Sequence, residues 1–442
     1  MSFNRRRFLS TSSAALAAPF VRTSRAAGTL AVGFWDHWVP GANDVLTKLC
    51  NEWAAKEKVD LKIDYITSLG SKLQLTISAE AQAKSGHDVL SWGNWSGVGQ
   101  APSLEPVDDL VESLIEQHGA PAAAFEYLGK QSGHWIAVPF TPGSQMKGPC
   151  ARIDLFRQHV GLDITKMYPA GAAPDRALTD AWTWDTFLVA ARKCFNAGFP
   201  FGIGMGQTPD SVDSAGAIFA AHGAHLVDAQ GNITVNSDAT RQALDYCKRL
   251  VQVLPPDVFA WDDASNNKWL IAGKGALIMN PPSAWAVAKR DNPKVAEQLW
   301  TFPSPKGQKG RFQPAAPFFC SIWKFSKNKS AARSLLAHLS QRAAVEQLVN
   351  ASAGYDIPPF LRLRNFKIWA EAGPPKGTLY NYPPSGDQIV AISGAPAPAA
   401  IGTQMYTQAT ITKMVAKFTQ GEQSMEQVIA WASSELEGFG RA

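Results

Sequence analysis

Residues 30–38, Leu-Ala-Val-Gly-Phe-Trp-Asp-His-Trp, join a short apolar run to a Trp-x-x-Trp pattern, and residues 89–95, Val-Leu-Ser-Trp-Gly-Asn-Trp, repeat the arrangement. Between these two stretches, the spacing of apolar residues predicts helices at 43–56 and 71–84. Alternating apolar residues predict a strand at 61–65. The order is β-α-β-α-β, which indicates parallel strands in an α/β fold.

Both Trp-rich loops follow the carboxyl ends of predicted parallel strands, where open α/β sheets bind ligands. Asp36, His37 and Asn94 are interleaved with the four indoles. Flat aromatic faces with a few hydrogen-bonding groups suit a ligand that has apolar C–H faces and a rim of hydroxyls, as a sugar or polyol has. The alternative is that these Trp residues are ordinary core aromatics. Their placement at two strand ends favours the ligand site.

The first 26 residues are predicted to be an export signal outside the fold. Residues 5–9, Arg-Arg-Arg-Phe-Leu, resemble the core of a twin-arginine signal, and residues 24–27, Ser-Arg-Ala-Ala, form a small-residue cleavage pattern. A Sec-type signal and an unprocessed basic tail are the alternatives. No other stretch reaches the roughly 20 apolar residues of a membrane helix. The mature chain is therefore expected in the periplasm, and no cysteine near the cleavage site could accept a lipid.

Composition limits the class of protein. A chain of 442 residues that is 45% hydrophobic should form two domains. The net charge of +5 equals the five arginines of the signal, and without them 37 basic residues face 37 acidic ones. Nucleic acid is excluded as a partner because phosphate binding needs a concentrated basic surface. The five cysteines show no paired motif and are interpreted as buried apolar residues. No cofactor and no metal site are predicted.

The rest of the chain reads as alternating helices and strands. A strand at 133–140 is followed by a break at 141–145, which is the first candidate crossing between lobes. Further predicted elements are a helix capped by Thr183, a glycine-interrupted strand at 201–205, a polar loop at 206–213, a helix at 237–253, a buried strand before Asn280, and a helical tail at 404–439 with a capping box at Ser424 and Gln427.

Five segments, in this order, carry a family likeness. They are Ser-Gly-His-Asp-Val at 85–89, Trp-Ile-Ala-Val-Pro-Phe at 135–140, Ala-Arg-Ile-Asp-Leu-Phe at 151–156, Thr-Trp-Asp-Thr-Phe at 183–187 and Ala-Gly-Lys-Gly-Ala-Leu at 272–277. Together they resemble a family 1 extracellular solute-binding protein, the periplasmic receptor of an ABC importer, in the maltose-binding and carbohydrate-binding group. Ala151 and Arg152 depart from the usual Tyr-Asn, and residues 314–319 replace a common glycine-rich segment, so the identity of the ligand does not carry over.

The resemblance implies a two-lobed periplasmic-binding-protein fold of type II. Each lobe would be an open α/β sheet flanked by helices, with the ligand cleft between the lobes. Crossings near 141, 318 and 352 would divide the chain into an N-terminal lobe of 27–141 plus 319–351 and a C-terminal lobe of 142–318 plus 352–442. Ligand would stabilise the closed form. The expected partner is the membrane permease, the expected state is a monomer, and no chemical transformation is expected.

Candidate ligand-binding residues come from both lobes and from the crossings. They are Asp36, His37, Trp38, Trp92, Asn94, Trp95, Thr141, Gln145, Asp213, Ser283, Trp285, Phe318, Phe319 and Tyr355. The aromatic residues would stack on the ligand, and the acids and amides would bind hydroxyls. Asp213 could instead be a helix N-cap, and Tyr355 could be a turn residue.

Two other functions stay open. A receptor of the same fold for polyamines or another cation would pair Asp36 and Asp213 with ammonium groups inside an aromatic box. A secreted polysaccharide-active enzyme would also line a cleft with Trp, but no acid and base pair stands in a motif context. The pairs at 108–109 and 262–263 are interpreted as capping or solvated acids.

Overall fold

The computed structural model describes residues 27–167, 169, 173–280, 283–371, 387–421 and 423–440. The predicted export signal therefore lies outside the described residues. Among the described helices, none combines the length and the apolar character needed to cross a bilayer.

The first three strands form the predicted parallel unit. β1 (Ala27–Trp35) lies between β2 (Val59–Ile66) and β3 (Val89–Gly93) and pairs with both in parallel. The connecting helices are α1 (Ala42–Glu57) and α2 (Lys72–Ala83). The helix α1 buries the apolar face that its spacing predicts, namely Leu46, Leu49, Cys50 and Trp53. The β-α-β-α-β prediction is confirmed.

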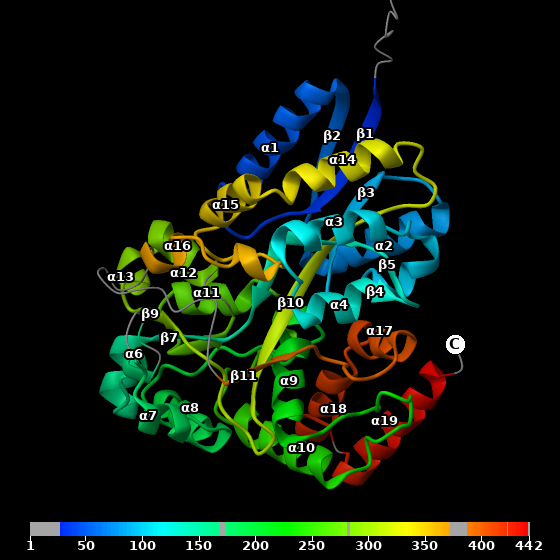
Figure 1. The fold of residues 1–442 in the computed structure, drawn as a ribbon. Helices are drawn as coiled ribbons and strands as arrows, with labels where there is room; N and C mark the ends of the chain where they lie inside the picture. Colours follow the sequence, from blue (N-terminus) through cyan, green and yellow to red (C-terminus); the bar gives the residue numbers. More distant parts are fainter. Residues whose placement is uncertain are drawn as a thin grey trace, which may run out of the picture.

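Two long antiparallel strands extend this sheet and run on beyond it. They are β6 (Val138–Met146) and β10 (Arg311–Ile322). β10 pairs antiparallel with β3 at its carboxyl end and parallel with β11 (Gln388–Ala391) at its amino end. In Figure 1, β10 crosses the molecule from its lower to its upper half.

The predicted break at 141–145 is wrong, because β6 continues through it to Met146. The pairing with β10 shifts register between Ala316 and Phe318. Such an irregularity accommodates Pro142, which cannot donate a hydrogen bond to the ladder. The chain therefore leaves the upper sheet as a continuous strand.

A second, smaller sheet of three strands forms the centre of the lower half. β7 (Pro149–Arg152) lies between β8 (Leu277–Met279) and β9 (Leu299–Thr301) and is antiparallel to both. The prediction of a strand at 201–205 is wrong. The only ladder contact described there is an isolated bridge between Gly202 and Ile278. Glycines leave few side chains to pack, which weakens a strand.

Helices cover both sheets and hold far more residues than the strands do. In the upper half these are α3 (Asp108–His118), α4 (Ala123–Gly129), α14 (Lys329–Leu339) and α15 (Arg342–Ala351), beside the hairpin of β4 (Lys130–Gln131) and β5 (His134–Trp135). In the lower half they are α5 (Ile153–Leu155), α6 (Ile164–Met167), α7 (Arg176–Ala181), α8 (Trp184–Asn196), α9 (Pro209–His222), α10 (Asp238–Val251), α11 (Ser265–Ile271), α12 (Ser283–Asp291), α13 (Pro293–Ala296), α17 (Ala399–Thr407), α18 (Thr410–Thr419) and α19 (Met425–Phe439). The short helix α16 (Ile368–Glu371) follows α15 in the sequence, after the loop that begins at Ser352.

Helix starts follow capping chemistry. Thr183 is the N-cap of α8 and Ser424 forms a capping box with Gln427, as predicted. Thr183 also forms a capping box with Thr186, which was not predicted. The helix α9 begins four residues before Asp213, with Thr208 as its N-cap, so the reading of Asp213 as an N-cap is wrong. Pro209 occupies the first helical position, where its missing N–H costs nothing.

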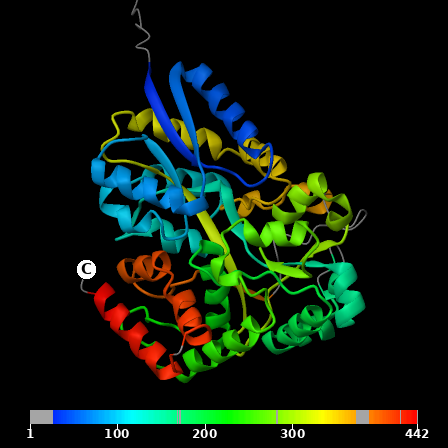
Figure 2. The same ribbon diagram turned by 180° about the vertical axis from the view of Figure 1, so that it is seen from behind.

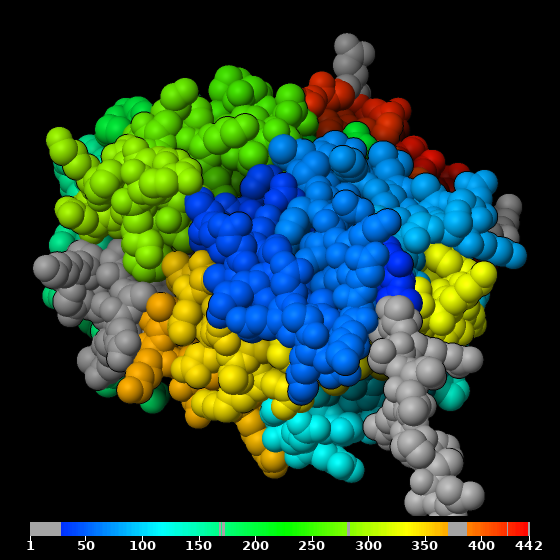
Figure 3. Space-filling model, turned by 90° about the horizontal axis from the view of Figure 1, so that it is seen from above, coloured from blue at the N-terminus to red at the C-terminus, as the bar shows by residue number. Residues whose placement is uncertain are grey.

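The molecule has two lobes, which Figures 1 and 2 show one above the other. The first lobe holds the β1–β3 sheet with α1–α4, α14 and α15, and the second holds the β7–β9 sheet with α5–α13 and α17–α19. One apolar core lies within the second lobe. A second apolar cluster is shared, because it joins residues of β1 and α1 to residues of β7–β9 and α11–α13. Seen from above in Figure 3, the blue surface of the first lobe lies directly beside the yellow-green surface of the second. All five cysteines are free and buried, as predicted.

Candidate functional site

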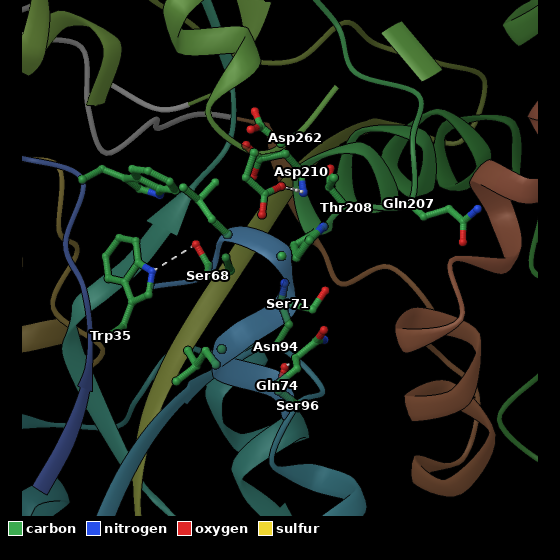
Figure 4. Close-up of a pocket in the computed structure, with 18 of the residues that line it drawn as sticks. Trp35, Ser68, Ser71, Gln74, Asn94, Ser96, Gln207, Thr208, Asp210 and Asp262 are labelled. Atoms are coloured by element: carbon green, nitrogen blue, oxygen red, sulfur yellow. Dashed lines mark hydrogen bonds between the residues drawn. The ribbon is translucent and has the colours of Figure 1, made fainter. Parts of the chain in front are cut away.

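A cavity of about 260 Å³ lies between the two lobes. Figure 4 shows Ser71, Gln74 and Asn94 on one side of it and Asp210 and Asp262 on the other. The first lobe contributes Trp35, Trp38, Ser68, Leu69, Gly70, Ser71, Leu73, Gln74, Gly93, Asn94 and Ser96, and the second contributes Gln207, Thr208, Pro209, Asp210, Ala260, Trp261, Asp262, Asp263 and Tyr406. The crossing strands contribute Gln145, Lys147, Ala316 and Phe318.

One wall of the cavity is aromatic. Trp35 ends β1, and its ring lies 5.2 Å from the Phe318 ring and 6.3 Å from the Trp38 ring, measured between centroids. The Trp35 indole N–H donates to Ser68 Oγ at 3.5 Å. Trp261 faces the cavity from the second lobe. Indoles therefore reach the same space from both lobes.

Asn94 links the two lobes and carries an unused acceptor. Its backbone φ is 49°, a left-handed conformation that Asn tolerates better than most residues. The Nδ2 group donates to Asp213 Oδ2 at 3.2 Å and to the Tyr406 hydroxyl at 2.6 Å. The Oδ1 atom is buried and has no hydrogen-bond partner among the described residues. A buried acceptor without a donor is costly, so a bound ligand that donates to it would be favoured.

A buried ion cluster forms the floor of the cavity. Lys147, just beyond β6, places Nζ 2.6 Å from Asp210 Oδ1 and 2.7 Å from Asp213 Oδ2. The side chains of Lys147 and Asp213 are only 3% and 2% exposed. Burial alone would lower the pKa of Lys147, but the two carboxylates outweigh it and hold that pKa well above its usual value. Lys147 is therefore a fixed cation that already has its counter-ions.

The two neighbouring acids at 262 and 263 have different roles. Asp262 is exposed and accepts from Ala264 N and Ser265 Oγ at 3.1 and 2.6 Å, and such bonds keep its pKa low. Asp262 is therefore a solvated acid in the turn before α11, one of the two predicted roles, and it does not cap the helix, whose N-cap is Ala264 without a side-chain cap. Asp263 is buried beside the cavity and accepts the Asp210 N–H at 3.3 Å. Burial, reinforced by the charge of Asp210, raises the pKa of Asp263 to about 7.

Four of the predicted site residues line the cavity, namely Trp38, Asn94, Gln145 and Phe318. Asp213 lies behind the floor, where it binds Lys147 and Asn94. Asp36 is exposed and accepts from Asn43 at 2.7 Å. Only the four lining residues come together at the cavity, although they lie far apart in the sequence, between positions 38 and 318.

The other predicted residues are outside the cavity lining. Trp92 stacks on Phe319 at 4.4 Å between ring centroids, and Trp95 donates to Ser393 O at 2.7 Å. His37 is bound to Asp356. Thr141, Ser283, Trp285 and Tyr355 are buried, and the Tyr355 hydroxyl donates to Gln145 Oε1 at 2.5 Å.

Several lining residues were not predicted from the sequence. Ser68, Ser71 and Gln74 follow the carboxyl end of β2, so the strand-end argument used for β1 and β3 could have found them. Lys147, Asp210 and Tyr406 carry no such local signal. The ion pairs that place Lys147 and Asp210 at the cavity join segments more than 60 residues apart.

The lobes also touch outside the cavity, where the Trp95 ring covers Gly402 of α17. A Cβ at position 402 would lie 2.5 Å from the indole, so we expect Gly402→Ala to disfavour this arrangement of the lobes by about 1–3 kcal/mol. The helix α17 itself should not suffer, because Ala is a better helix former than Gly. The expected result is a larger radius of gyration by small-angle X-ray scattering.

Gly438→Ala is the matched control, since a Cβ there meets nothing within 4 Å in the same group of C-terminal helices. An unchanged radius of gyration in Gly402→Ala would show that the Trp95 contact does not hold the lobes together.

Among the described residues, no group of three or more His, Cys, Asp or Glu side chains is placed to hold a metal ion. The site is thus a cavity of indoles, amides, hydroxyls and carboxylates, which can bind a small polar molecule in a defined orientation.

Solved structures of low sequence identity share this fold. Maltose-bound MalE3 of T. maritima superimposes with a TM-score of 0.74 at 18% identity, over 93% of this chain and 100% of that chain. A sugar transporter of Arthrobacter chlorophenolicus with bound laminaribiose gives 0.71 at 15% identity, over 93% and 99%. A solute-binding protein of Agrobacterium radiobacter in complex with ribitol gives 0.67 at 17% identity, over 93% and 98%.

A sequence relative points to the same group. The chain is 26% identical over 232 residues to a probable ABC transporter-binding protein of Deinococcus radiodurans, and this match covers 50% of the chain and 52% of that protein. The chain thus spans about half the length of this relative. A model of the bacterial extracellular solute-binding proteins matches residues 49–373, well over half of the sequence. With the two-lobed fold and the cavity between its lobes, this match shows that the chain belongs to the bacterial extracellular solute-binding protein family.

Proposed function

We propose that this protein is the exported receptor of an ABC importer and that it binds a carbohydrate or polyol between its lobes. The observation that carries this proposal is the interlobe cavity, which combines Trp35, Trp38 and Trp261 with hydroxyl and amide side chains. Indole faces pack against the C–H faces of a sugar ring, while serine, asparagine and glutamine side chains bind its hydroxyls.

The size of the cavity indicates a small solute. Its volume of about 260 Å³ is near the lower end of the range of roughly 300–1,000 Å³ that small-molecule sites occupy. Similar structures hold maltose and laminaribiose, which are disaccharides, and ribitol, which is a small polyol. These ligands support the solute class proposed here.

Closure of the lobes around the solute would give the importer a shape to recognise. We propose hinges near 141, 318 and 352, with an N-terminal lobe of 27–141 plus 319–351 and a C-terminal lobe of 142–318 plus 352–442. The strands β6 and β10 would bend at two of these hinges. The contact between Asn94 and Asp213 joins the lobes beside the cavity and would form on closure.

The remaining parts of the proposal concern the place and the partners of the protein. We propose that residues 1–26 direct twin-arginine export to the periplasm, that the mature chain is a monomer, and that it delivers its solute unchanged to an inner-membrane permease. The family of solute-binding proteins and the basic start of the chain support this.

A thermal-shift screen of the mature protein tests the solute class. A ligand that binds only the folded state raises Tm, so sugars or polyols are expected to stabilise the protein. Trp38→Ala should then weaken binding by about tenfold or more, because it removes an aromatic face from the cavity. Trp431→Ala, a half-buried indole on α19 outside the cavity lining, should leave affinity unchanged.

Stabilisation by no sugar or polyol would contradict the proposed solute class. Chemical turnover of a bound solute would contradict the receptor role, and equal losses in Trp38→Ala and Trp431→Ala would place the ligand elsewhere.

A further inference from the structure

The charges around the cavity do not balance. Among the described residues that line the cavity, Lys147 is the only basic one, and Asp210 and Asp213 already bind its Nζ. Asp263 adds a third buried carboxylate with no ion-pair partner among the described residues. When all three acids are ionised, the cluster carries two more negative than positive charges. Buried charge of this kind favours a ligand that brings a positive charge.

A second observation points to a ligand with hydrogen-bond donors. The Oδ1 atom of Asn94 is buried at the opposite side of the cavity without a donor, although the Nδ2 group of the same side chain makes two hydrogen bonds. Since Asn94 is only 4% exposed, bulk water does not satisfy this acceptor. Asp263 accepts hydrogen bonds from the Asp210 N–H and from the side chain of Thr208, so what it lacks among the described residues is a cation. Asn94 Oδ1 lacks a hydrogen-bond donor.

We propose, building on the function proposed above, that the solute is a polyhydroxylated compound with a protonated amine, as in an amino sugar. Asp263 binds the ammonium group, and Asn94 Oδ1 accepts a hydrogen bond from the same ligand. Trp35, Trp38 and Trp261 bind the apolar faces of such a ring and also tolerate a nearby cation.

The ionisation of Asp263 supports this assignment. The titratable and charged groups around it are Asp210, Lys147, Asp213, Tyr406 and the neighbouring Asp262. Burial and Asp210 raise the pKa of Asp263 to about 7, so much of this acid is protonated in the empty site at neutral pH. An ammonium ligand would lower this pKa and expel the proton. A neutral sugar would not lower the pKa of Asp263 and would release no proton.

Isothermal titration calorimetry of the mature protein tests the proposal. The ligands are glucose, glucosamine, N-acetylglucosamine and their β-1,4-linked dimers. Each is titrated at pH 6.5 in phosphate and in HEPES, because the different ionisation enthalpies of the two buffers reveal proton release. The free amine is expected to bind on the order of tenfold tighter than the matched neutral sugar. It should also release roughly half a proton or more per ligand, whereas the neutral sugars release none.

Two variants assign the effect to Asp263. Asp263→Asn keeps the shape of the side chain and should abolish both the amine preference and the proton release, while binding of the neutral sugar persists. Asp257→Asn makes the same charge change at an exposed residue of the same segment, outside the cavity lining, and should retain the preference.

Each outcome decides the question. Equal affinity for amine and neutral sugar, without proton release in the unmodified protein, would overturn the amine assignment but leave the carbohydrate receptor intact. An amine preference that survives in Asp263→Asn would overturn the role of Asp263. If calcium chloride raises Tm and the protein shows no amine preference, the acids bind an inorganic cation and the amine assignment is wrong. Binding of none of the sugars would overturn the proposed function itself.

Discussion

Replacing Lys147 with Met is expected to lower the free energy of unfolding by about 3–5 kcal/mol, the usual effect of breaking a buried ion pair. Lys147 Nζ lies within 2.7 Å of carboxylate oxygens of both Asp210 and Asp213. Methionine fills a similar volume but leaves those acids, together with Asp263, in a buried site without a cation. Chemical denaturation at pH 8, followed by tryptophan fluorescence, measures the loss.

The loss should depend on pH in a defined direction. Burial already raises the pKa of Asp213 and Asp263 in the presence of Lys147, and removing the cation raises both further. An acid whose folded pKa exceeds its unfolded value binds more protons in the folded state, so stability falls as pH rises from about 4 to above 7. Lys147→Met should therefore be least stable at alkaline pH and recover part of the loss near pH 5.

A rescue variant and a control separate this effect from lost packing. Adding Asp213→Asn to Lys147→Met removes one of the stranded charges and should restore part of the stability at pH 8. Lys48→Met, at a side chain that is 58% exposed, should change little. A loss in Lys147→Met that is independent of pH would show that the carboxylates are not the cause.

The fold could be predicted because it rests on local patterns. Apolar spacing in α1 and alternation in β2 follow directly from the periods of helix and strand, and the parallel order follows from the connection rules. The break expected at Pro142 failed because a register shift in a distant partner strand, β10, allows β6 to continue. Tertiary pairing thus overrode a turn signal.

The site was predictable from local pattern where a strand end marks it, while Gln145 and Phe318 were predicted from the expected crossings. Trp38 and Asn94 follow β1 and β3 and line the cavity as expected. Trp92 and Trp95 share the same motif, but both are 1% exposed because they pack against Phe319 and Gly402. Alternation along a strand decides which face an indole takes, and the motif alone does not show which face meets the other lobe.

The residues that give the cavity its charge were the hardest to predict. The sequence places Asp262 and Asp263 side by side, and both were interpreted as capping or solvated acids. The structure separates them, since Asp262 is exposed in the turn before α11 and Asp263 is buried next to Asp210. Only contacts between distant segments make this difference, and the proposed ligand depends on it.

A second large effect is expected at Asp356, which joins three segments where the lobes meet. Its Oδ1 atom accepts the Gly143 N–H of β6 at 2.8 Å and lies 3.1 Å from His37 Nε2, in the loop after β1. Val39 N donates to the other ring nitrogen of His37 at 2.9 Å, so Nε2 carries the proton and donates to Asp356. The carboxylate thereby fixes the loop after α15 to both the loop after β1 and the strand β6.

Asp356→Ala is expected to destabilise the protein by about 3–5 kcal/mol, because two buried donors lose their acceptor at a side chain that is 2% exposed. Asp356→Asn should cost less, since its amide oxygen can still accept from Gly143 while its NH2 group faces the His37 donor. Denaturant unfolding measures both, with Asp238→Ala as the control at a side chain that is 95% exposed. If Asp356→Ala matched that control, the three segments would have to be held by packing alone. The order expected here, in which Asp356→Ala is less stable than Asp356→Asn and Asp356→Asn is less stable than the unmodified protein, follows only if the hydrogen bonds to the carboxylate hold the three segments together.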